Sequence, residues 1–180
     1  MKPFFFMKAT IFSLLLISIL LFSCSHKSKK AAPQVPIEQQ QTEILQDFSI
    51  ADDKRDFHNL SEEIAKHDIT IIDFWASWCA PCRKEMPTMV VLRQHYTEAQ
   101  LGVIGISLDK DYDQWTAAYD EMQMQWRQFS ELKGWDSHIV QELGVTSIPY
   151  TIIVDSCRHI LAKGLRSKEL EIFIQNIIVQ

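Results

Sequence analysis

The sequence has no excess of basic residues and few cysteines, and each shortage excludes a class of protein. With 18 Lys and Arg against 23 Asp and Glu, the formal net charge is −5, so a polycationic surface that binds nucleic-acid phosphates is not expected. Four cysteines are too few for a disulfide-dense framework, and their spacing does not form two paired zinc knuckles. The sequence also contains no internal repeat. Its composition, 47% hydrophobic and 23% charged, is that of a folded globular protein.

The amino end of the 180-residue chain has the pattern of an export signal. Lys2 and Lys8 flank Phe4-Phe5-Phe6 and precede an uncharged, largely apolar stretch at 9–22. A membrane-spanning helix is the alternative, but such a helix needs roughly 20 apolar residues and this stretch is shorter. Residues 1–23 are therefore predicted to be a signal peptide.

The apolar stretch ends in Leu21-Phe22-Ser23-Cys24, which resembles the lipobox of bacterial lipoproteins. That resemblance implies that Cys24 is acylated and becomes the first residue of the mature chain; a buried or paired Cys24 is the alternative. Residues 24–46 are then the acylated cysteine and a flexible linker, because the segment offers almost nothing to bury. Ser25 resembles the pattern associated with sorting to the outer membrane.

The remaining residues, 47–180, have the size of a single domain. The segments 70–75 and 101–108 are apolar on both faces, which is typical of strands buried between two layers. Helices are predicted at 59–67, around 86–90, around 115–122, at 137–143 and from Ser167 onward, and a hairpin is predicted from 150–154 and 159–162. Residues 126–129 fit no single type of secondary structure. This alternation predicts an α/β fold with a central sheet covered by helices on both faces.

The chemistry of the chain converges on Trp78-Cys79-Ala80-Pro81-Cys82, directly after the first buried strand and at the start of a helix. Two thiols three positions apart can form a disulfide. The first thiol faces the unpaired N–H groups at the positive end of the helix, which favours its thiolate form. We therefore predict an exposed, largely deprotonated Cys79 as the attacking sulfur and Cys82 as the resolving thiol.

The alternatives for this cysteine pair are half of a zinc site and a purely structural disulfide. Zinc needs four ligands, and the six histidines show no second paired cluster, so no metal site is predicted. A structural disulfide is plausible in an exported protein. Asp73 favours reactivity instead, because a carboxyl group in an apolar strand has a raised pKa and can exchange protons near neutral pH. A hydrogen-bonded core aspartate with no chemical role is the other interpretation of Asp73.

The segment Asp73–Pro87 resembles the active-site segment of the thioredoxin superfamily, and Glu85 and Pro87 bring it closest to the exported TlpA and ResA type of thiol-disulfide oxidoreductase. Downstream, Gly144–Pro149 resembles the cis-proline loop of that family and Lys163-Gly164-Leu165 its bend before the last helix. The resemblance covers residues 47–180 and implies a thioredoxin-like fold with a mixed sheet.

The same resemblance implies roles for individual residues. Pro149 is expected to be cis and to pack against Cys79, which leaves the Ile148 backbone free to pair with an extended substrate. Asp73 is expected to move the proton of Cys82 during resolution. The residues expected to contact the substrate are Trp78, Ala80, Pro81 and Ile148.

These observations predict a membrane-tethered thiol-disulfide oxidoreductase that reduces protein disulfides in the bacterial cell envelope, with its domain in the periplasm. The Cys79–Cys82 disulfide is the only redox group expected. The expected partners are protein thiols and disulfides, apocytochrome c among them, and a membrane electron donor, with the domain itself a monomer. A redox-inert binding module with a permanent disulfide and a peroxide-reducing enzyme of thioredoxin fold are the alternatives.

Two further groups of residues are predicted to be structural. The extended chain from Pro149 to Cys157 spans about 26 Å. Cys157 is therefore expected at the far end of the sheet and inert toward the Cys79–Cys82 pair. The Met-rich segment Met122–Trp126 could suggest a soft-metal site, but packing explains it more readily.

Overall fold

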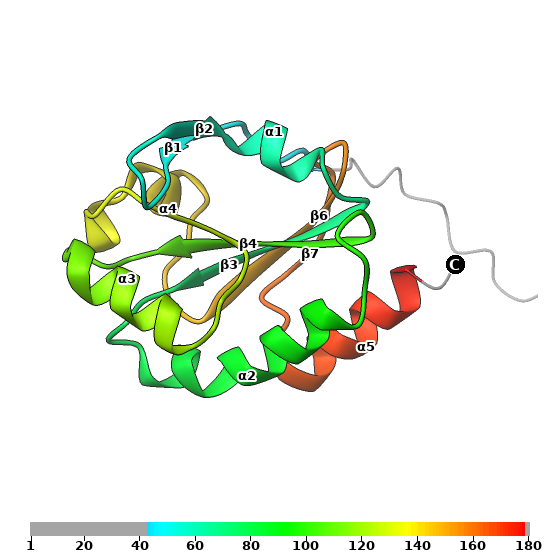
Figure 1. Cartoon of the computed structure of the whole chain (residues 1–180). Helices are drawn as coiled ribbons and strands as arrows, with labels where there is room; N and C mark the ends of the chain where they lie inside the picture. The colour runs from blue at the N-terminus through cyan, green and yellow to red at the C-terminus, as the bar shows by residue number, and fades with distance from the viewer. Residues whose placement is uncertain (1–42, 179–180) are drawn as a thin grey trace, which may run out of the picture. The chain divides into compact units, whose positions relative to one another are not determined.

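The computed structural model describes residues 43–178 (Figure 1). The predicted signal peptide, Cys24 with its acylation and most of the predicted linker lie outside these residues. No helix among residues 43–178 is long and apolar enough to span a bilayer.

A five-stranded mixed sheet forms the centre of the fold, in the order β5-β4-β3-β6-β7. β3, β4 and β5 are parallel to one another, β6 is antiparallel to β3, and β7 is antiparallel to β6. The strands are β3 (Ile69–Trp75), β4 (Leu101–Ser107), β5 (Arg127–Ser130), β6 (Tyr150–Asp155) and β7 (Ile160–Lys163). The predicted α/β class and central mixed sheet are confirmed, and the residues of uncertain type near 126–129 lie in or beside β5.

Helices cover both faces of this sheet, as the sequence predicts. On one face α2 and α5 lie side by side (Figure 1), and α3 joins them through an ion pair from Arg83 to Glu121 at 2.8 Å. On the other face lies α1, with α4 nearby. The helices are α1 (Leu60–Ile64), α2 (Ala80–Gln94), α3 (Tyr112–Glu121), α4 (His138–Glu142) and α5 (Ser167–Ile178), with a 3₁₀ turn, η1, at Gly134–Asp136.

One part of the sequence interpretation is wrong in its bounds. The helix predicted at 59–67 is only the five-residue α1, and it follows a small hairpin of β1 (Ser49–Ala51) and β2 (Phe57–Asn59) that the sequence did not indicate. Asn59 is the cap residue, but its side chain bonds to Glu62 at 3.1 Å rather than to the helix backbone. The free N–H of Ser61 instead donates to Asp47, so a residue outside the helix satisfies its first turn.

The two central strands, β3 and β4, determine where the cysteine pair lies in the fold. Every residue of β4 and all of β3 except Ile69 is buried, because both faces of these strands are covered. In the β3–β6 register, Phe74 pairs with Tyr150 and Ile69 pairs with Asp155, so the two chemically distinct ends of the sheet are separated by the length of the strands. Cys157 follows Asp155 and is exposed at the end away from Cys79, as predicted.

Candidate active site

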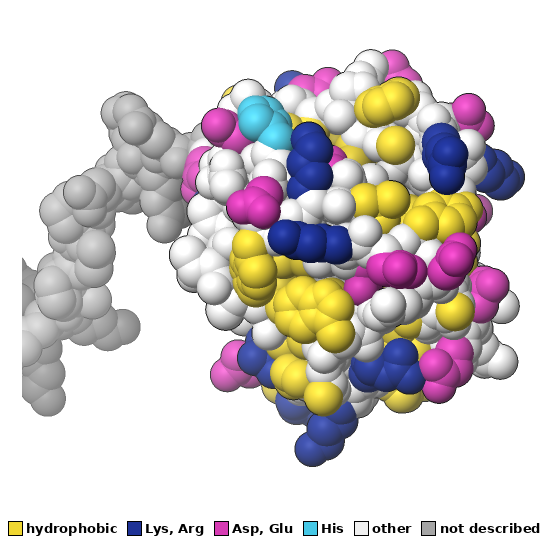
Figure 2. Space-filling model, turned by 90° about the vertical axis from the view of Figure 1, so that its left-hand side faces the viewer, with side chains coloured by type: hydrophobic (Ala, Val, Ile, Leu, Met, Phe, Trp, Pro, Cys, Tyr) yellow, Lys and Arg dark blue, Asp and Glu magenta, His cyan; other side chains and the backbone are white. Residues whose placement is uncertain are grey.

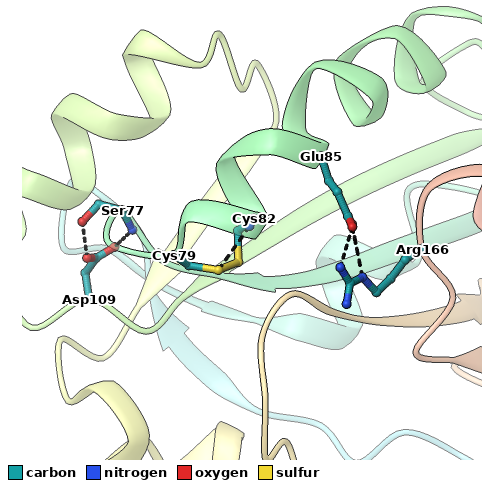
Figure 3. The surroundings of a disulfide bond; sticks show 6 residues. All are labelled: Ser77, Cys79, Cys82, Glu85, Asp109 and Arg166. Carbon is teal, nitrogen blue, oxygen red and sulfur yellow. Dashed lines mark hydrogen bonds and ion pairs between the residues drawn. A yellow bond between two sulfur atoms is a disulfide. The ribbon is translucent and has the colours of Figure 1, made fainter.

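The cysteine pair stands at the amino end of α2, where β3 delivers the chain. Cys79 is the cap residue of this 15-residue helix, and Pro81 occupies its first turn, where a missing N–H has no cost. The two cysteines form a disulfide with a Cα–Cα distance of 5.3 Å. The sulfur of Cys79 accepts a hydrogen bond from the backbone N–H of Cys82 at 3.2 Å (Figure 3). In the reduced protein this N–H and the positive end of α2 favour a thiolate at Cys79.

The prediction that the Cys79 sulfur is exposed is wrong for the disulfide form. Cys79 is only 4% exposed and Cys82 only 1%. In this form the Cys79 sulfur is bonded to that of the buried Cys82. The exposed positions are the intervening Ala80 and Pro81 and the preceding Trp78.

Asp73 lies in the middle of β3, between Gly105 of β4 and Thr151 of β6, and is 4% exposed. Burial, reinforced by the negative charge of Glu85, raises the pKa of Asp73 to about 7. Asp73 and Cys82 line the same small cavity. The carboxyl group can therefore gain or lose a proton near neutral pH beside the buried thiol of the pair.

An ion pair that the sequence analysis did not assign borders this cavity. Arg166, on the loop before α5, holds Glu85 with its Nη2 atom 2.6 Å and its Nε atom 3.1 Å from Oε1 (Figure 3). The two residues are 81 positions apart in the sequence, so only the packing of α5 beside α2 brings them together.

A second contact that the sequence did not indicate fixes the loop ahead of Cys79. Asp109, buried at the end of β4, accepts hydrogen bonds from the Ser77 N–H at 2.9 Å and from the Ser77 hydroxyl at 2.6 Å (Figure 3). The Ser107 hydroxyl donates to the same carboxylate at 2.7 Å. Charge-assisted hydrogen bonds of this kind hold the loop in one conformation and thereby position the cysteine that follows.

The loop before β6 has the conformation that the family resemblance implies. The Ile148–Pro149 peptide bond is cis. Pro149 is buried and lines the cavity that contains Asp73 and Cys82, and Ile148 is partly exposed beside it. The structure therefore brings Pro149 together with Asp73 and Cys82.

The face at the left of Figure 1, where β3 and β4 end, carries hydrophobic side chains over its centre (Figure 2). The exposed fraction of Trp78 is 53%, and that of Trp135, on η1 after the neighbouring strand β5, is 41%. Large exposed aromatic side chains supply contact area at protein interfaces. In residues 43–178, no group of three or more His, Cys, Asp or Glu side chains could hold a metal ion, and Met124 packs in the core.

Comparison with known proteins agrees with this arrangement. Residues 67–160, more than half of the chain, match the family model described as thioredoxin-like. The protein belongs to the thioredoxin-like family. The matched part of this thioredoxin-like protein runs from the residues before β3 to the start of β7 and includes both cysteines, Asp73 and Pro149.

Individual relatives support the predicted similarity to the ResA type. The thiol:disulfide interchange protein HelX of Rhodobacter capsulatus is 32% identical over 95 residues, which are 53% of this chain and 51% of the relative. The thiol-disulfide oxidoreductase ResA of Oceanobacillus iheyensis is 32% identical over 87 residues, 41% of this chain and 45% of that protein. The thioredoxin-like chain thus spans about half the length of these curated relatives. A solved C-terminal domain from Bacteroides thetaiotaomicron superposes with a TM-score of 0.71 at 29% identity, covering 77% of this chain and 95% of that domain.

Proposed function

We propose that this protein is a thiol-disulfide oxidoreductase that reduces disulfides of other proteins. The observation that carries the proposal is the Cys79–Cys82 disulfide at the start of α2, with Asp73 buried beside Cys82. A disulfide that served stability alone would not require a carboxyl group held near a pKa of 7 next to one of its sulfurs. The names of the relatives HelX and ResA support the same activity.

In the proposed reaction the reduced protein begins with both thiols. The Cys79 thiolate attacks one sulfur of the substrate disulfide, a mixed disulfide forms, and the other substrate sulfur leaves as a thiolate that takes up a proton. Cys82 then gives its proton to the Asp73 carboxylate and attacks the sulfur of Cys79. The Cys79–Cys82 bond forms, the mixed disulfide breaks, and the second substrate thiolate leaves. Two electrons pass from the cysteine pair to the substrate, and an external dithiol or membrane donor restores the pair.

The substrate is proposed to lie across the hydrophobic centre of the face in Figure 2. Trp78 supplies exposed contact area beside the cysteines, and Ala80 and Pro81 leave the start of α2 open. An extended segment of the substrate would pair with the backbone at Ile148.

A reductase assay tests this proposal. The protein should accelerate the reduction of a model protein disulfide by a dithiol, and Cys79→Ser should remove the acceleration completely, because Cys82 alone cannot form the Cys79–Cys82 bond that completes the exchange. Cys157→Ser is the matched control and should keep the wild-type rate. Equal rates with and without the wild-type protein would contradict the proposal.

The alternative of a redox-inert binding module makes a different prediction for the disulfide. If the pair serves stability alone, a mild dithiol should not reduce it without unfolding the domain. Differential alkylation combined with circular dichroism distinguishes the two. The reductase predicts a reduced and fully folded protein, and an unfolded reduced protein would favour the binding module.

The proposal includes the cell envelope and a lipid anchor at Cys24, on the basis of the lipobox resemblance. The domain would then act as a monomer in the periplasm, with the linker setting its distance from a membrane and protein thiols, including those needed for cytochrome c maturation, as substrates. Mass spectrometry of the protein from its native membrane should find an acylated amino-terminal Cys24. A mature protein that retains residues 1–23 or lacks the lipid would contradict this part of the proposal.

A further inference from the structure

The Glu85–Arg166 ion pair is the feature of the site that the reaction above leaves unused. Glu85 projects from α2 one turn after Cys82, and Arg166 reaches it from the loop before α5 (Figure 3). The guanidinium contacts the carboxylate through two nitrogens, Nη2 at 2.6 Å and Nε at 3.1 Å from Oε1. Such two-point geometry fixes the position of the carboxylate as well as compensating its charge.

This ion pair borders the cavity that contains the reacting groups. The cavity is lined by Asp73, Cys82, Glu85 and Arg166 together with uncharged side chains from α2, β6 and the start of α5. The part of the cavity that the centre of a water molecule can occupy is about 20 Å³, which is room for about one water. Asp73 and the Glu85–Arg166 pair thus share one small, poorly solvated space in which charges interact strongly.

The charged groups around Asp73 are few. Glu85 and Arg166 are the charged residues that line the cavity with it, and the disulfide-bonded Cys82 adds no charge. The neighbouring positions on the adjacent strands are Gly105 and Thr151, which carry no charge. Glu85 is the charged group that adds to the effect of burial in raising the pKa of Asp73. The contact of Arg166 with Glu85 is therefore the route by which Arg166 can influence Asp73.

We propose that Arg166 is a positioning residue for the resolving step: by clamping Glu85 at the edge of the cavity, it limits the negative charge that reaches Asp73. This inference rests on the proposed function, in which Asp73 accepts the proton of Cys82. With the clamp in place, Glu85 and Arg166 present a compensated pair to the cavity. Without it, an uncompensated carboxylate faces Asp73 and makes its ionisation harder, since like charges oppose each other. Arg166 thereby sets the pH at which Asp73 can act.

The test follows the carboxyl signal of Asp73 by ¹³C NMR in the full-length disulfide form, so it does not depend on turnover. In wild type the signal should titrate near pH 7. In Arg166→Gln the midpoint should rise to about 8, and in Glu85→Gln it should fall to about 6. The double variant should match Glu85→Gln alone, because Arg166 has no effect once Glu85 is neutral. Arg166→Lys keeps the charge and should remain close to wild type.

Lys168→Gln is the matched control, because it also removes one positive charge near the start of α5, but Lys168 pairs with Glu171 at 2.8 Å and does not line the cavity. Its Asp73 midpoint should equal that of wild type. An unchanged midpoint in Arg166→Gln, or a double variant that differs from Glu85→Gln, would overturn the proposal.

The pH dependence of resolution gives a second readout. In single-turnover reactions the step from mixed disulfide to Cys79–Cys82 should require a higher pH in Arg166→Gln, with the rate of the initial Cys79 attack unchanged. Equal shifts in both steps would overturn a role specific to resolution. If wild type forms no mixed disulfide at all, the proposed reductase function fails, whereas the NMR titration still decides the role of Arg166.

Discussion

A Cys82→Ser variant is expected to accumulate a mixed disulfide between Cys79 and its substrate. Cys79 still attacks, but no second thiol stands beside it to release the product. A well-oriented intramolecular attack reaches an effective concentration of about 10⁵ M, about 10⁸ times that of a millimolar external thiol, so release by external thiol should be slower by up to about 10⁸-fold. The adduct should appear on non-reducing gels and disappear with excess dithiol, and multiple turnover should be lost.

The exposed Cys157 requires a matched background for this experiment, because any surface thiol can form adducts with disulfides. We expect the trapped species in Cys82→Ser/Cys157→Ser and its absence from Cys79→Ser/Cys157→Ser. Adduct formation that depends on Cys157 alone, or an active wild type whose Cys82→Ser variant traps nothing, would contradict the assigned roles of the two cysteines.

Replacing Asp73 by Asn should stabilise the disulfide form at alkaline pH. The pKa of Asp73 is raised from 3.8 to about 7 by burial and by Glu85. Between these values the folded protein holds a proton that the unfolded chain has released, so the free energy of unfolding falls as pH rises from about 4 to about 7. Above pH 7 the full cost of a buried carboxylate is present, about 4 kcal/mol. Urea unfolding across this range should show wild type losing that stability relative to Asp73→Asn.

Asp56→Asn provides the matched control, because Asp56 is exposed and far in sequence from the cysteine pair. Its difference from wild type should not change with pH. The same Asp73→Asn protein should resolve mixed disulfides about 10²-fold more slowly, since it lacks the proton acceptor for Cys82. A constant stability difference from pH 4 to pH 8 would show that Asp73 is an ordinary hydrogen-bonded core residue.

The centre of this fold is readable from the sequence because its signals are local. Both central strands carry continuous apolar runs, and the cysteine pair marks the start of α2. Asp73 is predictable for the same reason, since a single carboxyl group in a buried strand is conspicuous in the sequence. The cis bond before Pro149 came from family resemblance, because an X–Pro sequence alone gives only a weak preference for cis.

The features that the sequence did not predict depend on tertiary packing. The hairpin of β1 and β2 has three-residue strands, too short to show a periodicity. Arg166 and Asp109 act on residues 81 and 32 positions away, and nothing in their local sequences marks them. Cys79 is 4% exposed in the disulfide form, which the spacing of the two cysteines does not reveal.

The central claim is that Cys79 is an activated thiol, and the rate at which it is alkylated tests this most directly. The measurement uses reduced Cys82→Ser/Cys157→Ser protein and iodoacetamide over a range of pH. The backbone N–H at position 82 and the positive end of α2 should place the midpoint clearly below the value of about 8.5 for free cysteine, with a correspondingly faster reaction at neutral pH. A midpoint at or above 8.5 and a rate no faster than that of free cysteine at neutral pH would contradict the account.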